Sequence, residues 1–206
     1  MSLYSGLSAG GPSAHSDILT ATPDNEPSRR SLIEEIKRRG RACVVAKNYP
    51  DADAIYGKGI EVLSSVITNN KEGNNEDEVH NCEKDISIFY SNRSLVRMQM
   101  GKIAEALEDA DEAVRYDPAY VKAHWRRGQA ANACGNTSMA LESFEKALEL
   151  DPTNKALMKE VESVKKKKEE EEKLLAEGGG VDEKKENDAK MEEASPKSTN
   201  DALKDA

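Results

Sequence analysis

The sequence lacks the features of several specialised classes of protein. It has three cysteines, Cys43, Cys82 and Cys134, and none of them forms a C-x-x-C pair, which argues against a disulfide framework or a structural zinc site. No segment approaches the roughly 18 uncharged apolar residues of a membrane span. Positive charge is not in excess either, since the net charge is -9. A negatively charged protein is repelled by the phosphate backbone, which argues against general binding to nucleic acid.

Targeting and catalytic patterns are missing too. The first thirty residues have neither a basic start nor an apolar run, and Ser2 stands where N-myristoylation requires glycine. We therefore expect a cytoplasmic protein with reduced thiols and no membrane partner. His15 and His80 have no partner at metal-ligand spacing, and no motif of a nucleophile and its base occurs. We expect no enzyme, no metal site and no cofactor.

What is present divides the chain into three parts. Residues 1–30 combine glycine, proline and serine with little apolar content, which predicts a disordered N-terminal arm. Residues 31–164 carry nearly all of the helical periodicity and should form the folded domain. From residue 165 the composition is reduced largely to Lys, Glu, Asp and Gly, which predicts a charged helix extension and a disordered tail over 165–206.

Two segments of the middle part align at a fixed period, with two helical stretches and a glycine-containing turn in each unit. Small residues at recurring positions would let two antiparallel helices approach closely, and a proline marks the end of the second helix. The recurring pairs, each 34 residues apart, are Gly101 and Gly135, Ala106 and Ala140, Ala113 and Ala147, and Pro118 and Pro152.

This pattern resembles the tetratricopeptide repeat (TPR), which has small residues at three packing positions, an aromatic residue in the second helix and a proline after it. The resemblance implies an all-α fold, a three-repeat helix-turn-helix solenoid with a C-terminal solvating helix, flanked by disordered tails. The matching residues are Gly128, Ala140, Phe144, Ala147 and Pro152 in the last repeat, Ser94, Ala106, Ala113 and Pro118 in the middle one, and Gly40, Ala52, Tyr56 and Gly59 in the first.

The first two repeats are further apart than the last two. Ala52 and Ala106 are separated by 54 residues instead of 34, so the chain carries an insertion of 20. We interpret this polar insertion as a long loop between repeats, with longer flanking helices as the alternative. The predicted boundaries are about 31–67 for repeat 1, 68–85 for the insertion, 86–118 for repeat 2, 119–152 for repeat 3, and 153 for the start of the capping helix.

Positive charge gathers on the first and last of the three inner helices. Lys37 and Arg41 are four residues apart, as are Lys122 and Arg126, so each pair shares one helix face and repels unless an anion lies between its members. Asn92, on the middle inner helix, adds an amide donor. The five residues form a ring of donors suited to a carboxylate, with charge-assisted hydrogen bonds of roughly 1.5 to 3 kcal/mol each.

These five positions resemble the carboxylate clamp of TPR co-chaperones such as the Hsp70/Hsp90 organising protein. The resemblance implies an adaptor that binds the C-terminal tail of Hsp70 or Hsp90, which ends in Glu-Glu-Val-Asp. Four of the five positions have the residue type of the family, whereas Arg41 stands where the family usually has asparagine. The alternative is a TPR scaffold subunit that binds a different peptide or helix and has no chaperone role.

Overall fold

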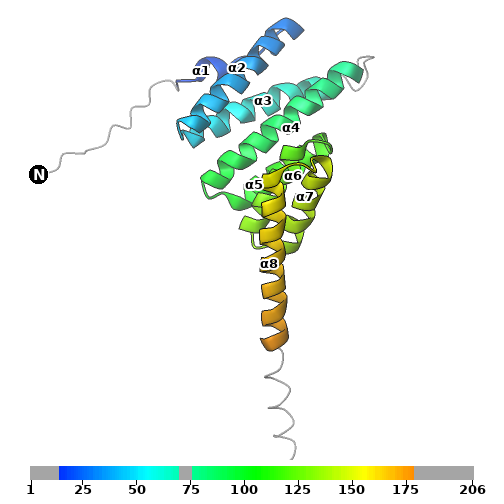
Figure 1. The fold of residues 1–206 in the computed structure, drawn as a ribbon. Coiled ribbons are helices and arrows are strands. Elements are labelled where there is room, and N and C mark those ends of the chain that lie inside the picture. The colour runs from blue at the N-terminus through cyan, green and yellow to red at the C-terminus, as the bar shows by residue number, and fades with distance from the viewer. Residues whose placement is uncertain (1–13, 70–75, 179–206) are drawn as a thin grey trace, which may run out of the picture. The chain divides into compact units, whose positions relative to one another are not determined.

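The computed structural model describes residues 14–69 and 76–178, and these residues form eight helices and no strand (Figure 1). The prediction of an all-α fold is therefore confirmed for the described residues. The chain divides into two compact units after Val164, and each unit is described by itself. None of the described helices is long and apolar enough to cross a membrane.

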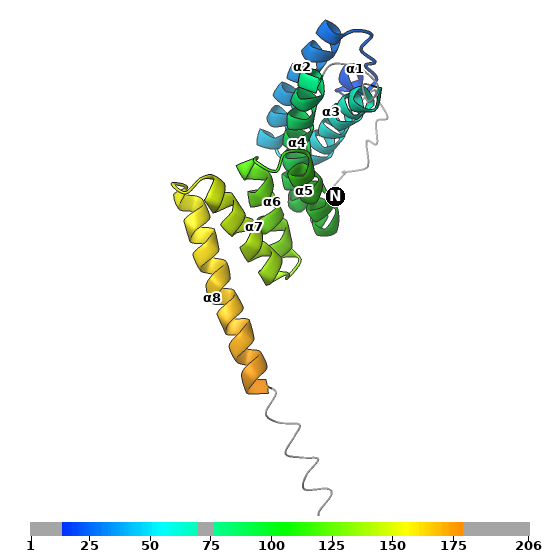
Figure 2. The ribbon, with the colours of Figure 1, turned by 90° about the vertical axis from the view of Figure 1, so that its right-hand side faces the viewer.

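The first unit consists mainly of three antiparallel helix pairs, α2 with α3, α4 with α5, and α6 with α7, and Figure 2 shows the last pair side by side. A short helix, α1, precedes them, and the beginning of α8 follows. The bounds are α1 (Ser16–Leu19), α2 (Glu26–Val45), α3 (Tyr49–Asn69), α4 (Glu76–Gln99), α5 (Ile103–Tyr116), α6 (Val121–Ala133), α7 (Thr137–Leu150) and α8 (Lys155–Gly178).

In the first and third pairs the two helices touch where a glycine lies beneath an aromatic ring. A Cβ atom added to Gly128 in α6 would lie 2.6 Å from the Phe144 ring of α7, and Gly40 in α2 faces the Tyr56 ring of α3 in the same way. Both rings are buried. The predicted small and aromatic positions are therefore the two sides of one contact, which sets how closely the helices pack.

Two hydrophobic clusters form the core of the first unit. One cluster lies between α2, α3 and α4 around Ile36, Tyr56 and Phe89. The other surrounds Phe144 of α7 and includes three residues of α8, Leu157, Val161 and Val164, which are buried as predicted for a capping helix. The beginning of α8 therefore covers the apolar face that the last pair would otherwise expose to water.

The prediction of a disordered arm is wrong for residues 14–30. Asn25 accepts a hydrogen bond from the backbone in the first turn of α2, and Pro27 lies in that turn, where a missing N–H group costs nothing. Ile18 of α1 is buried in the first cluster. The segment has few apolar residues, as a disordered segment does, but it is ordered by the Asn25 cap and the buried Ile18 side chain. Residues 1–13 lie outside the described residues.

The insertion, predicted as a loop over 68–85, is helical over residues 68–69 and 76–85, so the loop interpretation is wrong there. α3 continues to Asn69 and α4 begins at Glu76, while residues 70–75 lie outside the described residues. Glu76, Asp77 and Glu78 occupy the first turn of α4, where negative charge interacts favourably with the helix dipole. Cys82 is the buried residue on this part of α4. Because Cys82 is the one residue of this segment that is buried, its sequence is polar and resembles that of a loop.

The charged extension forms the rest of α8, from residue 165 to Gly178. This end coincides with the first residue of the Gly178-Gly179-Gly180 run. The tail predicted to be disordered, residues 179–206, lies outside the described residues.

The turn of the first helix pair contains an unfavourable residue. Gly101 and Gly135 have φ angles of +76° and +79°, and Lys47, at the equivalent place between α2 and α3, has φ of +58°. A left-handed conformation costs a non-glycine residue about 1 to 2 kcal/mol. Lys47→Gly should therefore raise the free energy of unfolding by about 1 kcal/mol in urea denaturation. Lys47→Ala removes the same side chain without freeing φ, so a similar gain from alanine would contradict the explanation.

The glycine and ring contact can be tested with two glycines in helices. Gly128→Ala should lower the free energy of unfolding by about 1 to 3 kcal/mol, because the new methyl group overlaps the Phe144 ring. The matched control is Gly57→Ala in α3, where the added Cβ meets only Arg93 at 3.5 Å. This control should stabilise the protein by about 0.5 to 1 kcal/mol through helix propensity. Equal effects of the two substitutions would refute the contact.

Candidate functional site

The first helices of the three pairs are neighbours. Arg29 of α2 pairs with Glu78 of α4, Lys37 of α2 pairs with Asp85 of α4, and α4 packs against α6. The two ion pairs advance in the same direction along both helices, so α2 and α4 run parallel. All five residues of the predicted clamp lie on these helices: Lys37 and Arg41 on α2, Asn92 on α4, and Lys122 and Arg126 on α6.

A buried ion-pair network holds α4, the helix that carries Asn92. Arg93 donates two hydrogen bonds to Asp109 of α5, at 2.9 and 2.7 Å, and Arg97 lies 3.1 Å from the same carboxylate and from Asp53 of α3. The Asp109 side chain is only 4% exposed. Because α3, α4 and α5 all contribute charges, the network fixes the rotation of α4 between its two neighbours.

Arg126 is a half-buried cation without a carboxylate partner among the described residues. Its Nη1 atom donates to the Gln129 amide oxygen at 2.6 Å, and its guanidinium lies 5.6 Å from the centre of the Trp125 ring. Burial lowers the pKa of Arg126, and the nearby Tyr120 only partly offsets it. A cation held this way is poorly compensated, and a ligand anion would stabilise it.

Tyr120 connects the two cationic ends of the candidate site. It precedes α6, and burial raises the pKa of its hydroxyl, an effect that Arg126 and Arg41 both oppose. The cations of α6 and α2 therefore both act electrostatically on one phenol, although they are 85 positions apart in the sequence. Tyr120 is absent from the predicted site because no repeat position marks it.

Three other clamp residues have side chains without a partner among the described residues. They are Arg41, Asn92 and Lys122. Arg41 and Lys122 are exposed, and Asn92 is half-buried. Within the part of the chain that the structure describes, Arg41 and Lys122 form no ion pair, and the Asn92 side chain forms no hydrogen bond. Their donors therefore point to no internal acceptor.

Lys37 differs from the other clamp residues because it is already paired. Its Nζ atom lies 2.8 Å from Asp85 of α4 and 2.9 Å from Glu34 one turn earlier on α2, and the side chain is 17% exposed. Burial disfavours its charge, but the hydrogen bonds from Asp85 and Glu34 outweigh this effect and raise the pKa of Lys37. Asp85 was missed because its segment was interpreted as a loop. Asp85 precedes Asn92 by seven residues, which is two turns of a helix. If α4 had been extended back to residue 85, this spacing would have placed Asp85 on the same face as Asn92.

Most cations on α2, α4 and α6 form ion pairs. The few that do not show where positive charge is available to a ligand. In residues 26–45, 76–99 and 121–133, the paired cations are Arg29, Arg30, Lys37, Arg38, Arg39, Arg93, Arg97 and Arg127. The cations of these segments without an ion pair to a described residue are Arg41, Lys84, Lys122 and Arg126. Three of these four belong to the predicted clamp, so the uncompensated positive charge is concentrated there.

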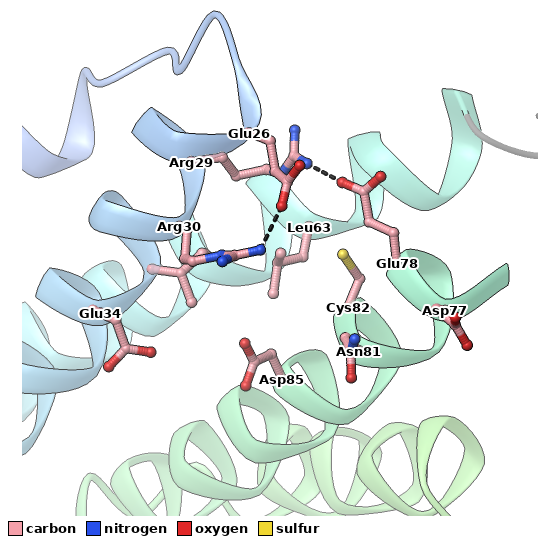
Figure 3. Close-up of a pocket in the computed structure, with 11 residues that line it drawn as sticks. Glu26, Arg29, Arg30, Glu34, Leu63, Asp77, Glu78, Asn81, Cys82 and Asp85 are labelled. Atoms are coloured by element: carbon pink, nitrogen blue, oxygen red, sulfur yellow. Dashed lines mark hydrogen bonds and ion pairs between the residues drawn. The ribbon is translucent and has the colours of Figure 1, made fainter. Parts of the chain in front are cut away.

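A separate cleft of about 280 Å³ lies where α2, α3 and the beginning of α4 meet (Figure 3). Its charges are largely paired within the cleft, since Arg29 contacts Glu78 and Arg30 contacts Glu26. Ile33, Leu63 and Cys82 supply apolar lining. The cleft therefore has no concentration of positive charge, and it adjoins the candidate carboxylate site at Glu34 and Asp85, the partners of Lys37.

Several other polar and aromatic residues have structural places. Phe89 is buried against Gly59, Tyr90 stacks on Tyr116, and the His124 ring nitrogen lies 2.8 Å from the Pro118 carbonyl oxygen. The three cysteines are free thiols. Among the residues that the structure describes, no group of three His, Cys, Asp or Glu side chains could hold a metal ion.

The repeat architecture is also found by comparison with known families. Residues 92–155 match the family model described as tetratricopeptide repeat. The chain contains a TPR domain. This confirms the resemblance of the recurring small residues, and the helix pairs α4 with α5 and α6 with α7 are two of the repeats.

Relatives of this TPR domain occur within larger proteins. The human "DnaJ homolog subfamily C member 7" is 32% identical over 137 residues, which are 66% of this chain and 24% of that protein. The chain therefore spans about a quarter of the length of this relative.

Two solved structures are similar in both sequence and fold. The second TPR domain of human RPAP3, in complex with the HSP70 peptide SGPTIEEVD, is 26% identical with a TM-score of 0.52, covering 66% of this chain and 98% of that one. The C. elegans myosin chaperone UNC-45, in complex with an Hsp90 peptide, is 27% identical with a TM-score of 0.54, covering 70% and 14%.

The network around Asp109 should be essential for stability. Asp109→Asn leaves Arg93 and Arg97 beside an uncharged amide, so we expect the free energy of unfolding to fall by about 3 kcal/mol. Asp111→Asn is the control, because Asp111 lies on the same helix but pairs with Arg127 at the surface. Its loss should stay below about 1 kcal/mol in the same urea titration. Similar losses for both variants would show that burial of the network is unimportant.

Proposed function

We propose that this TPR domain is a co-chaperone-type adaptor that binds the acidic C-terminal peptide of Hsp70, Hsp90 or both. The observation that carries the proposal is the set of uncompensated cations on α2 and α6. Arg126 is the strongest case, since burial lowers its pKa and no described carboxylate pairs with it. A ligand with several carboxylates would supply the missing negative charge.

The binding mechanism is electrostatic and geometric. Lys122 and Arg126 lie one turn apart on α6 and would hold a side-chain carboxylate and the backbone of the peptide. Arg41 and Lys37 on α2, with Asn92 on α4, would hold the region of the terminal carboxylate. The peptide would thus bridge the first helices of all three repeats. We expect micromolar affinity, about 8 kcal/mol, that weakens as salt screens the charges.

The relatives support this partner class. The RPAP3 domain, with 26% identity, has the HSP70 peptide SGPTIEEVD as its ligand, and the UNC-45 structure contains an Hsp90 peptide. The first peptide ends in two glutamates, a valine and an aspartate, so its last four residues carry four carboxylates. This ligand chemistry matches the uncompensated cations of α2 and α6. The proposed activity is binding, without a catalytic step.

Calorimetric titration with the peptide SGPTIEEVD tests the proposal. The free peptide should bind more tightly than its C-terminally amidated form by about tenfold or more, because amidation removes a charge-assisted interaction of roughly 1.5 kcal/mol or more. Lys122→Ala/Arg126→Ala should weaken binding by about 100-fold, since two such interactions are lost.

The matched control for the double variant is Lys155→Ala/Lys159→Ala on α8. These two lysines are also four residues apart. They are exposed, and they lie outside α2, α4 and α6. The control should change affinity less than threefold, roughly the effect of a screened surface charge. Equal binding of free and amidated peptides would favour a scaffold that takes a different peptide or helix, and so would an unchanged affinity in the α6 double variant.

A further inference from the structure

One residue of the candidate clamp is occupied from within the chain. The Lys37 ammonium lies within 2.9 Å of two carboxylates, Asp85 on α4 and Glu34 on α2. Figure 3 shows Glu34 and Asp85 on facing helices at one end of the cleft. Asp85 is the less exposed of the two, at 29% against 68% for Glu34. The α4 carboxylate is therefore the better shielded from water.

A ligand carboxylate that approached Lys37 would meet these two negative charges. Like charges within a few ångströms repel each other, and the repulsion is strongest where water is partly excluded. Two of the three N–H donors of the ammonium already face carboxylates, and its charge is compensated by them, so a ligand carboxylate would compete with Asp85 for the same positive charge. The net gain from Lys37 is then the small difference between two similar ion pairs.

Arg41 lies one helical turn beyond Lys37 and has no such competitor among the described residues. Since α2 and α4 run parallel, with Arg29 level with Glu78 and Lys37 level with Asp85, this turn leads in the direction of Asn92. Arg41 is also the α2 cation that acts on the Tyr120 hydroxyl, together with Arg126 of α6. It is thus the α2 residue placed to share a ligand with α6.

We infer that Asp85 is an internal competitor for the ligand carboxylate at Lys37, and that Arg41 supplies the main cationic contact from α2. This inference rests on the proposed function and refines its binding site. The arginine at position 41 compensates for a lysine that Asp85 has neutralised. The clamp cations without an ion pair to a described residue are Arg41, Lys122 and Arg126, and Asn92 adds an amide donor. An acidic peptide end binds to these residues.

A mutant cycle with the same peptide tests the competition directly. Asp85→Asn should tighten binding about threefold to tenfold, and Lys37→Ala should change the affinity of the wild type less than twofold. In the Asp85→Asn background, Lys37→Ala should weaken binding about tenfold, because the released lysine now makes a charge-assisted contact. Arg41→Asn should weaken binding of the wild type about tenfold.

Asp77→Asn is the matched control for charge. Asp77 lies on the same helix, is exposed and forms no ion pair with a described residue. It removes the same charge without releasing Lys37, so its effect should stay below twofold. Circular dichroism and urea unfolding of each variant report whether the fold is kept, and Glu34→Gln provides a second, surface route to partial release of Lys37.

The outcomes separate this inference from the proposed function. If the peptide binds and the Lys122/Arg126 variant loses binding, but Lys37→Ala has equal effects with and without Asp85, the competition is refuted and the clamp stands. An Arg41→Asn variant that binds more tightly than the wild type would also overturn the inference, because the arginine would then obstruct the site. Absence of binding to every variant overturns both.

Discussion

The close contact between a glycine and an aromatic ring is the constraint on which the fold depends. Where Gly40 faces Tyr56 and Gly128 faces Phe144, no other side chain fits without moving the ring. The contact brings two helix backbones together and buries a large ring at the same point. It occurs in the first and third repeats, and in the middle repeat the small residues Ser94 and Ala106 meet instead, with the Ser94 hydroxyl donating to the Ala106 carbonyl oxygen. The candidate site consists of side chains on the first helices of the three repeats.

The surface of the first helices is organised by which charges are paired. Ion pairs between α2 and α4, and the buried network around Asp109, use four cations, Arg29, Lys37, Arg93 and Arg97, to hold the helices together. Of the cations on these helices without an ion pair to a described residue, Arg41 and Arg126 both act on Tyr120. An overall acidic protein can therefore present a local site for acidic ligands, because many of its carboxylates are already neutralised by ion pairs within the chain. Net charge alone would have predicted the opposite preference.

The regular features of the fold could be predicted from the sequence, because small residues recur at packing positions with a period of 34 residues. Two segments could not. Residues 14–30 and 76–85 are poor in apolar residues, and each is ordered by a few local interactions, such as the Asn25 cap and the buried Cys82. The five clamp positions could be named from helix spacing and family resemblance. The pairing of Lys37 with Asp85 could not, since it depends on the register between two helices that a misassigned loop had separated.

Gly59 and Phe89 repeat the glycine and ring contact between α3 and α4, which belong to different repeats. At the next junction the corresponding positions hold Ala113 and Ala123, both fully buried but much smaller. In a solenoid, cooperativity depends on the interface between neighbouring repeats. Repeats 1 and 2 should therefore unfold as one block, while the boundary before α6 is the hinge at which the array first opens. A peptide held by Arg41 and Arg126 would span that hinge and suppress its opening.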